Sequence, residues 1–165
     1  MRNVIKRIDY TPPTYWIEKV DLTFELNPQK TQVSNTMKIV RNSNLPSAPL
    51  ILNGENLILI QITLDGQLLG EDRYQMDKHS LTIANLPEQF ELSITTLIHP
   101  DRNTELEGLY ISNDIFCTQC EAHGFRRITY FLDRPDVMTL FTTKIIADKQ
   151  RYPQLLSNGN LIETG

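Results

Sequence analysis

One short segment, residues 117–123 with the sequence Cys-Thr-Gln-Cys-Glu-Ala-His, contains several side chains that can bind a metal ion or a small ligand. Two thiols and an imidazole at the spacing Cys-x-x-Cys-x-x-His resemble part of a zinc site. A structural zinc site needs a fourth ligand, and no second motif of this kind lies nearby. In an extended strand Cys117 and Cys120 point to opposite faces and cannot share a metal with His123. A redox dithiol normally has a βαβ setting, which is missing, and the alternative is two small, partly buried cysteines.

The same segment places an amide and a carboxylate two residues apart. In an extended strand Gln119 and Glu121 lie on one face, about 7 Å apart at a rise of roughly 3.3 Å per residue. Such a pair can bind a small cation that carries hydrogen-bond donors. The alternative is structural: Glu121 pairs with Arg126 or Arg127 and only fixes its loop. The spacing alone leaves both interpretations open.

No other arrangement typical of an enzyme is found in the sequence. The three histidines, His79, His99 and His123, lie in separate segments, so no His-Glu-x-x-His helix is present. The sequence also lacks a Gly-x-Ser-x-Gly turn and a glycine-rich phosphate loop. Most acidic residues alternate with apolar ones, where exposure to solvent explains them. We therefore assign no catalytic residue and no metal ligand within the chain.

Alternation of apolar and polar residues with a period of two recurs along the chain and predicts β-strands. The expected strands are 20–26, 31–41, 58–64, 73–76, 80–83, 90–98 and 141–147. Asp65-Gly66 predicts a two-residue hairpin turn, because both central residues of such a turn take positive φ. Asn158-Gly159 predicts a second hairpin, over 155–162. Asp133-Arg134-Pro135-Asp136 predicts one short helical turn near 135–140.

These elements predict an all-β fold, an antiparallel sandwich or a saddle-like pair of sheets with the one helical turn. A chain of 165 residues fits a single domain, 1–165. Because the last predicted hairpin runs almost to Gly165, we expect this domain to be truncated at its C-terminal edge.

Composition excludes several classes of protein. Hydrophobic residues make up 40% and charged residues 22% of the chain, as in ordinary globular proteins. The net charge of −4 argues against a nucleic-acid partner, which needs a basic face. The longest apolar run, near 57–64, is far shorter than the roughly 20 residues of a membrane span. Two cysteines form no disulfide framework, so we expect a cytoplasmic protein that binds neither nucleic acid nor membrane.

Residues 119–137 resemble the first domain of the bacterial aminopeptidase N family. The stretch reads Gln-Cys-Glu-Ala-His-Gly-Phe-Arg-Arg-Ile-Thr-Tyr-Phe-Leu-Asp-Arg-Pro-Asp-Val. The family pattern is close to Gln-x-Glu-x-x-Gly-Phe-Arg-x-Ile-Thr-Tyr-x-Leu-Asp-Arg-Pro-Asp-Val. Further matches lie at 9–13, 106–110, 141–144, 152–153 and 155–160. The resemblance thus extends over almost the whole chain, although the family does not fix Cys117, Cys120 or His123.

The resemblance implies the N-terminal domain of a zinc aminopeptidase, a hydrolase that removes N-terminal amino acids from peptides in peptide catabolism. Family members hold zinc (Zn²⁺) on a His-Glu-x-x-His helix and carry a Gly-x-Met-Glu-Asn segment, both in a later, catalytic domain. Residues 1–165 contain neither motif, so we expect no zinc and no activity in this part alone.

The resemblance also implies a role for two side chains. Gln119 and Glu121 match the pair that recognises the peptide N-terminus in the family, which implies binding of the substrate's free α-amino group. The implied partners are the N-terminus of a peptide and the missing catalytic domain of the same chain. A standalone β-sandwich that binds other proteins is the alternative.

Overall fold

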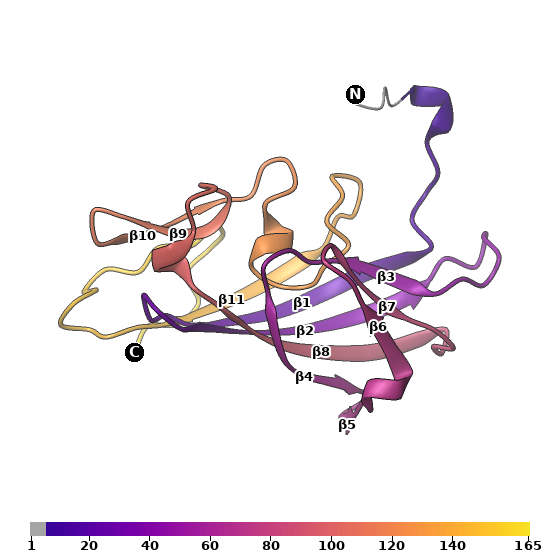
Figure 1. The fold of residues 1–165 in the computed structure, drawn as a ribbon, viewed down its shortest axis with the longest axis horizontal. Helices are drawn as coiled ribbons and strands as arrows, with labels where there is room; N and C mark the ends of the chain where they lie inside the picture. Colours follow the sequence, from indigo (N-terminus) through magenta and orange to yellow (C-terminus); the bar gives the residue numbers. More distant parts are fainter. Residues whose placement is uncertain (1–5) are drawn as a thin grey trace.

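The computed structural model describes residues 6–165 and consists almost entirely of β-strands and loops (Figure 1). The largest sheet has six strands in the order β11-β1-β2-β8-β4-β5. Its strands are β11 (Leu140–Ile146), β1 (Tyr15–Glu25), β2 (Thr31–Arg41), β8 (Gln89–Ile98), β4 (Ile58–Leu64) and β5 (Gln67–Leu68). No helix among the described residues is long and apolar enough to cross a membrane.

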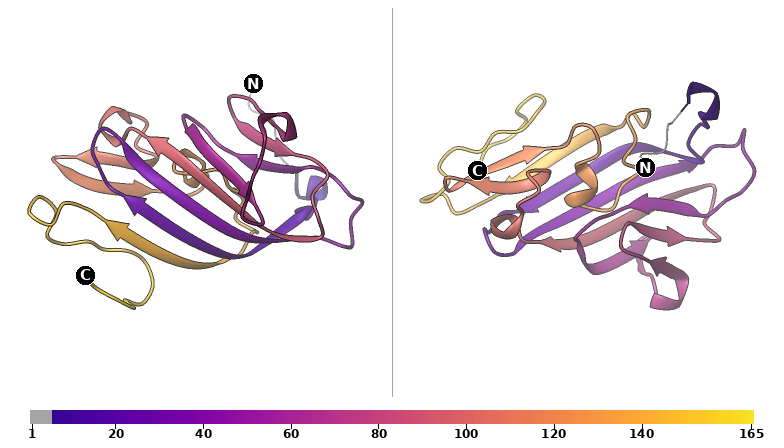
Figure 2. Two further views of the ribbon diagram at one scale, coloured as in Figure 1. Left: turned by 90° about the horizontal axis from the view of Figure 1, so that it is seen from below. Right: turned by 45° about the horizontal axis from the view of Figure 1, so that its top comes forward.

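Two smaller sheets and several short helical turns complete the fold. A three-stranded sheet has the order β3-β7-β6, and β9 pairs with β10 in a separate hairpin. These strands are β3 (Leu50–Asn53), β7 (Ser80–Ile83), β6 (Tyr74–Met76), β9 (Gly108–Ser112) and β10 (Ile115–Gln119). The 3-10 turns are η1 (Arg7–Asp9), η2 (Glu71–Arg73), η3 (Pro100–Arg102) and η4 (Phe125–Arg127). Both smaller sheets lie over the same side of the curved six-stranded sheet (Figure 2).

The core forms where alternate side chains of the large sheet meet the three-stranded sheet and the segment after β10. Burial of these apolar side chains is the main force that stabilises the fold. Fully buried members from the sheets are Val20, Val33, Met37, Ile39, Leu50, Leu52, Leu81, Ile83, Leu92 and Ile94. The segment after β10 contributes Ile128, Tyr130, Phe131 and Leu132 to the same cluster.

Polar side chains fix this last segment, 125–133, against the large sheet although most of it forms no strand. The Asn35 side-chain amide donates to the Tyr130 carbonyl at 3.2 Å, and the Thr96 hydroxyl donates to the Ile128 carbonyl at 3.2 Å. Asn53 and Phe131 exchange two backbone hydrogen bonds of 2.7 and 3.0 Å. Because buried carbonyl and amide groups need partners, these contacts replace the ladder that a strand would have supplied.

The predicted all-β fold is confirmed, and several strands agree closely with the expected ranges. The strands predicted at 31–41, 58–64 and 80–83 are β2, β4 and β7 with the same bounds. The Asp65-Gly66 hairpin is also confirmed: it joins β4 to β5, with φ of 49° and 77° at the two central residues.

Four details differ from the sequence-based expectations. The helical turn expected near 135–140 is a single hydrogen-bonded turn, in which the Val137 amide donates to the Arg134 carbonyl at 3.2 Å. The hairpin expected at 155–162 is wrong, since the chain beyond β11 contains no strand up to residue 165. β11 runs parallel to β1, whereas the other strand pairs are antiparallel. β3, with no clear alternation over its four residues, was not expected at all.

Candidate functional site

The β9–β10 hairpin positions the segment that the sequence marked for chemistry. Its turn, Asn113-Asp114, has φ of 49° and 62°, as a tight two-residue hairpin requires. The hairpin register places Gln119 opposite Gly108. The Phe116 ring packs against the Tyr152 ring at a tilt of 59°, with 5.0 Å between their centroids, and this contact attaches the hairpin to the chain beyond β11.

Gln119 and Glu121 come together at the end of this hairpin. The Gln119 amide nitrogen donates to the Glu121 carboxylate at 3.1 Å, and both side chains are exposed. The expectation of two residues on one face of a strand is wrong in detail, because β10 ends at Gln119 and Glu121 lies in the following turn. The turn brings the two side chains into direct contact.

Two glycines allow the turn to pack tightly on the hairpin. The Gly124 amide donates to the Cys120 carbonyl at 2.8 Å. A Cβ on Gly124 would overlap the Gln119 carbonyl oxygen and lie 3.0 Å from the Cys120 Cα. Gly108 has a φ of 73°, and a Cβ there would lie 2.8 Å from the Cβ of Arg127. The close approach of these backbones therefore defines where Gln119 and Glu121 are held.

Arg126, which follows the turn, is fixed by Asp133. Its Nε lies 2.8 Å from the Asp133 carboxylate, its backbone amide donates to the same carboxylate at 3.2 Å, and its guanidinium donates to the Asp133 carbonyl at 3.0 Å. Asp133 is a buried carboxylate, and a buried charge is stable only when it is paired and hydrogen-bonded in this way.

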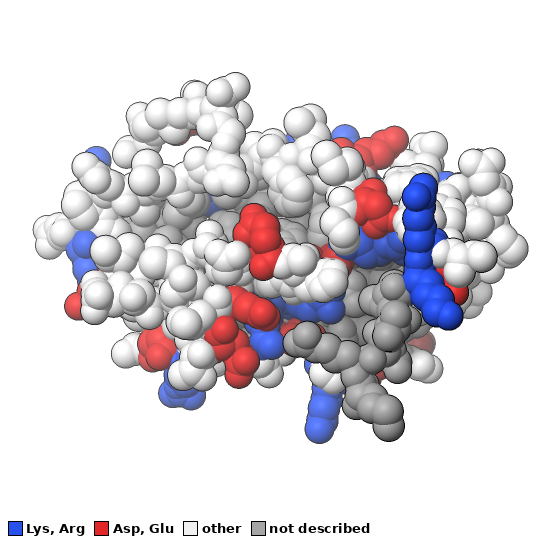
Figure 3. All heavy atoms as spheres, turned by 90° about the horizontal axis from the view of Figure 1, so that it is seen from above, with Lys and Arg blue, Asp and Glu red and all other residues white. Residues whose placement is uncertain are grey.

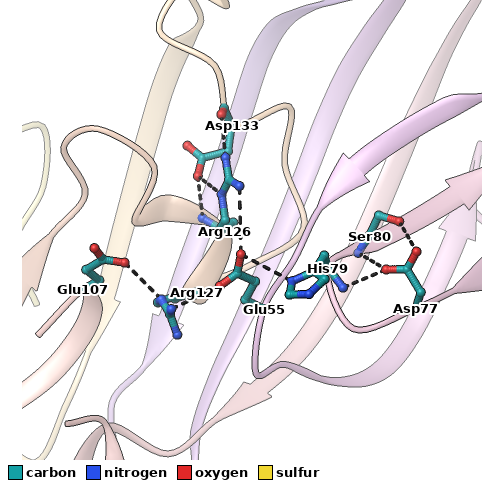
Figure 4. A network of polar contacts seen from close by, with 8 residues as sticks. All are labelled: Glu55, Asp77, His79, Ser80, Glu107, Arg126, Arg127 and Asp133. Atoms are coloured by element: carbon teal, nitrogen blue, oxygen red, sulfur yellow. Dashed lines mark hydrogen bonds and ion pairs between the residues drawn. The ribbon is translucent and has the colours of Figure 1, made fainter. Parts of the chain in front are cut away.

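Arg127 lies between two other carboxylates (Figure 4). Its guanidinium is 3.1 Å from Glu55 and 3.2 Å from Glu107. Glu55 also approaches Arg126 at 4.0 Å and His79 at 3.6 Å, so it joins three basic side chains. The ion pairs between Glu121 and these arginines, which were the alternative interpretation of the sequence, are therefore not formed. Within the described part of the chain, residues 6–165, no ion pair involves Glu121.

Among residues 6–165, the face of the molecule seen from above has no large patch of one charge (Figure 3). There, acidic and basic side chains are interspersed among uncharged ones (Figure 3).

The cysteines and His123 do not form the zinc motif that their spacing resembles. Cys117 and Cys120 are free thiols and both are partly buried. Burial, together with the nearby charges of Glu121 and Asp133, raises the pKa of the Cys120 thiol to about 11. The thiolate is the metal-binding form, so this thiol is a poor ligand at neutral pH. Over residues 6–165 no three His, Cys, Asp or Glu side chains converge on one point, and this donor set does not fit zinc.

Sequence reasoning missed Glu55 and Glu107 as the partners of the arginines. Glu55 lies between β3 and β4, far from Arg127 in the sequence, and its surroundings, Asn-Gly-Glu-Asn, indicate only a turn. No local signal in the sequence could have found this contact.

The fold and the site together define an all-β domain that presents an amide–carboxylate pair at the end of a hairpin. Residues 12–165 match the family model of the Peptidase M1 N-terminal domain. The chain belongs to this family, and the sequence-based prediction of an aminopeptidase N-terminal domain is confirmed.

The similarity to individual relatives extends over nearly the whole chain. The chain is 52% identical over 159 residues to aminopeptidase N of Escherichia coli (strain K12), covering 96% of this chain and 18% of that protein. Among solved structures, Legionella pneumophila aminopeptidase A in complex with aspartic acid is 37% identical, with a TM-score of 0.88 over 96% of this chain and 19% of that one. The chain therefore spans about a fifth of the length of these relatives.

A more distant structure shares the fold alone. The M1 zinc metallopeptidase of Deinococcus radiodurans, bound to a Tyr-Ser-Ala substrate, is 15% identical, with a TM-score of 0.68 over 81% of this chain and 33% of that one.

Proposed function

We propose that this chain serves as the N-terminal domain of a zinc aminopeptidase that removes N-terminal amino acids from peptides, and that Gln119 and Glu121 bind the substrate's free α-amino group. The observation that carries this proposal is the 3.1 Å hydrogen bond between the two side chains, at an exposed turn where Glu121 has no basic partner within residues 6–165. Similarity to aminopeptidase N over 96% of the chain supports the reaction class.

The chemistry of the pair suits an ammonium group. A peptide's α-amino group has a pKa of about 8 and is mostly charged at neutral pH. A carboxylate accepts a charge-assisted hydrogen bond from this ammonium group, and such a bond is stronger than one between neutral groups. Gln119 uses its amide nitrogen to hold one oxygen of Glu121, and this leaves the second oxygen for the substrate. An internal peptide bond has no ammonium, so this site selects for the ends of chains.

The peptide bond itself would be hydrolysed elsewhere. When bound in the catalytic domain of a full-length parent, zinc would polarise the carbonyl and activate water. The donor set of residues 6–165 does not fit zinc, so this domain contributes binding and orientation of the substrate and no step of hydrolysis. The span of about a fifth of the relatives' length supports a parent with further domains over a standalone binding module. A cytoplasmic location stays a prediction.

The test is Glu121→Gln in the full-length parent, a substitution that preserves volume and removes the charge. Loss of one partner of a desolvated charge pair costs about 2–5 kcal/mol. At about 1.4 kcal/mol per factor of ten, kcat/KM should fall roughly 30-fold to several-thousand-fold. Zinc content and melting temperature should be unchanged, because Glu121 is exposed and forms no ion pair within residues 6–165.

A substrate with a blocked N-terminus is the control. The wild-type enzyme should strongly prefer the free amine, and the variant should lose most of that preference. If Glu121→Gln keeps kcat/KM within about a factor of three of the wild type, the pair is not the ammonium site.

A further inference from the structure

Arg126 and Arg127 follow residues 119–124, which we call the recognition turn. Neither arginine neutralises the carboxylate of Glu121 in this turn. A guanidinium near a free carboxylate normally forms a charge-assisted pair with it. In this structure Arg127 instead lies 3.1 Å from Glu55 and 3.2 Å from Glu107. Arg126 is held by Asp133 at 2.8 Å (Figure 4). The carboxylate of Glu121 is left with the Gln119 amide as its hydrogen-bond partner.

The backbone of Arg127 lies beside the β9–β10 hairpin, which carries Gln119. Its Cβ would lie 2.8 Å from a Cβ on Gly108, and Gly108 is the residue opposite Gln119 in the β9–β10 register. Paired strands are only about 4.8 Å apart. The side chain of Arg127 therefore starts beside Gly108, on the strand next to the one that carries Gln119. In this structure its guanidinium is directed at Glu55 and Glu107.

Glu55 is the more firmly placed of those two partners. Its backbone amide donates to the Arg126 carbonyl at 2.9 Å, and the side chain is only 23% exposed. Two residues earlier, Asn53 exchanges backbone hydrogen bonds with Phe131. Glu107 is 53% exposed, so solvent weakens its hold on Arg127.

We propose that Glu55 is a positioning residue, which holds Arg127 away from Glu121 and so keeps the Glu121 carboxylate free for the ammonium group of a peptide substrate. This inference rests on the proposed function of Glu121. A released guanidinium would compete with the ammonium for the same carboxylate, so only the unpaired fraction of the enzyme would bind substrate. Arg126 has three hydrogen bonds to Asp133 and does not depend on Glu55 to the same degree.

The experiment uses the full-length enzyme and an aminoacyl chromogenic substrate. Glu55→Gln should raise KM by about threefold to thirtyfold with little change in kcat, because a binding-competent state becomes less populated. Adding Arg127→Gln to this variant should return KM to within about twofold of the wild type, since the competitor is then gone. A merely structural role predicts the reverse, because the double variant loses still more of the ion-pair network.

The Glu121→Gln background separates this inference from the proposed function. If Glu55 acts through Glu121, Glu55→Gln should not raise KM further once the Glu121 charge is absent. A lower kcat/KM for Glu121→Gln together with an unchanged KM for Glu55→Gln overturns the positioning role and leaves the proposed function intact. An equal rise in KM in both backgrounds also overturns it. If Glu121→Gln itself has no effect, both proposals fail.

A second variant covers the case in which Glu55→Gln reduces the yield of folded enzyme. Glu107→Gln removes the exposed partner of Arg127 and should leave the melting temperature unchanged. It should raise KM in the same direction by a smaller factor, and Arg127→Gln should again reverse the rise. An unchanged KM in Glu107→Gln would then count against the proposal.

Discussion

Replacing Gly124 with alanine adds one methyl group at the tightest point of the recognition turn. That Cβ would overlap the Gln119 carbonyl oxygen, and would lie 3.0 Å from the Cys120 Cα and 3.1 Å from the Gly108 nitrogen. All three are backbone atoms, so no side-chain rotation can relieve the contact. Overpacking of this kind costs about 1–3 kcal/mol. Gly124 has a φ of −83°, so alanine gains about 0.4–1 kcal/mol through the unfolded state. The net loss of stability should be about 1–2 kcal/mol.

Urea denaturation of the 165-residue chain measures this loss, and Gly70→Ala is the matched control. At Gly70, where φ is −66°, the added Cβ meets only the end of the Asp72 side chain, which can rotate away. Gly70→Ala should therefore be neutral or slightly stabilising. In the full-length enzyme Gly124→Ala should also lower kcat/KM, because the turn must shift Gln119 relative to Glu121. If Gly124→Ala is as stable as Gly70→Ala and keeps full activity, the packing argument is refuted.

Three further predictions concern metal, thiols and pH. The isolated chain should neither hydrolyse an aminoacyl chromogenic substrate nor bind stoichiometric zinc; turnover that survives repurification, or one tightly held zinc per chain, would contradict the domain assignment. Because burial raises the pKa of Cys120 to about 11, alkylation of this thiol under native conditions should be slow at pH 7 and faster toward pH 10. Mass spectrometry of labelled peptides measures the rate. Rapid labelling of Cys120 at pH 7 would show that the thiol is not protected. Hydrogen bonds from Arg134 lower the pKa of Asp136 in the folded state. This carboxylate therefore stabilises the fold fully above its unfolded pKa of about 3.9. The contribution is lost as the pH falls through the lower pKa of the folded state. Asp136→Asn should consequently flatten the acid limb of the stability profile below about pH 4 in urea titrations, and an unchanged profile would mean that the pair with Arg134 adds no stability.

The strands could be predicted where the signal is local. In β2 and β8, buried and less buried positions alternate over most of the strand and most buried side chains are apolar, as burial on one face of a sheet requires. The Asp65-Gly66 turn could be predicted because positive φ is needed at both positions. Asn158-Gly159 carries the same local signal, but no flanking strands form, so a turn signal alone does not make a hairpin.

The contacts of the candidate site depend on residues that are distant in the sequence. Proximity along the chain allowed a pair between Glu121 and Arg126 or Arg127, but these arginines instead pair with Glu55, Asp133 and Glu107. The parallel pairing of β11 with β1 is equally invisible locally, because either direction of pairing buries the same alternating side chains.

The sequence by itself determined the all-β class, most of the strands, the family, and the two residues proposed to recognise the substrate. These follow from period-two alternation, turn chemistry and a long specific match, all of which are properties of contiguous residues. The tertiary structure alone decided that Gln119 contacts Glu121, that Gly108 and Gly124 hold the turn against the hairpin, and that Glu55 takes Arg127 as its partner. The physical reason is that an ion pair depends on distance in space, and the fold brings together the β3–β4 connection and η4 from opposite halves of the chain.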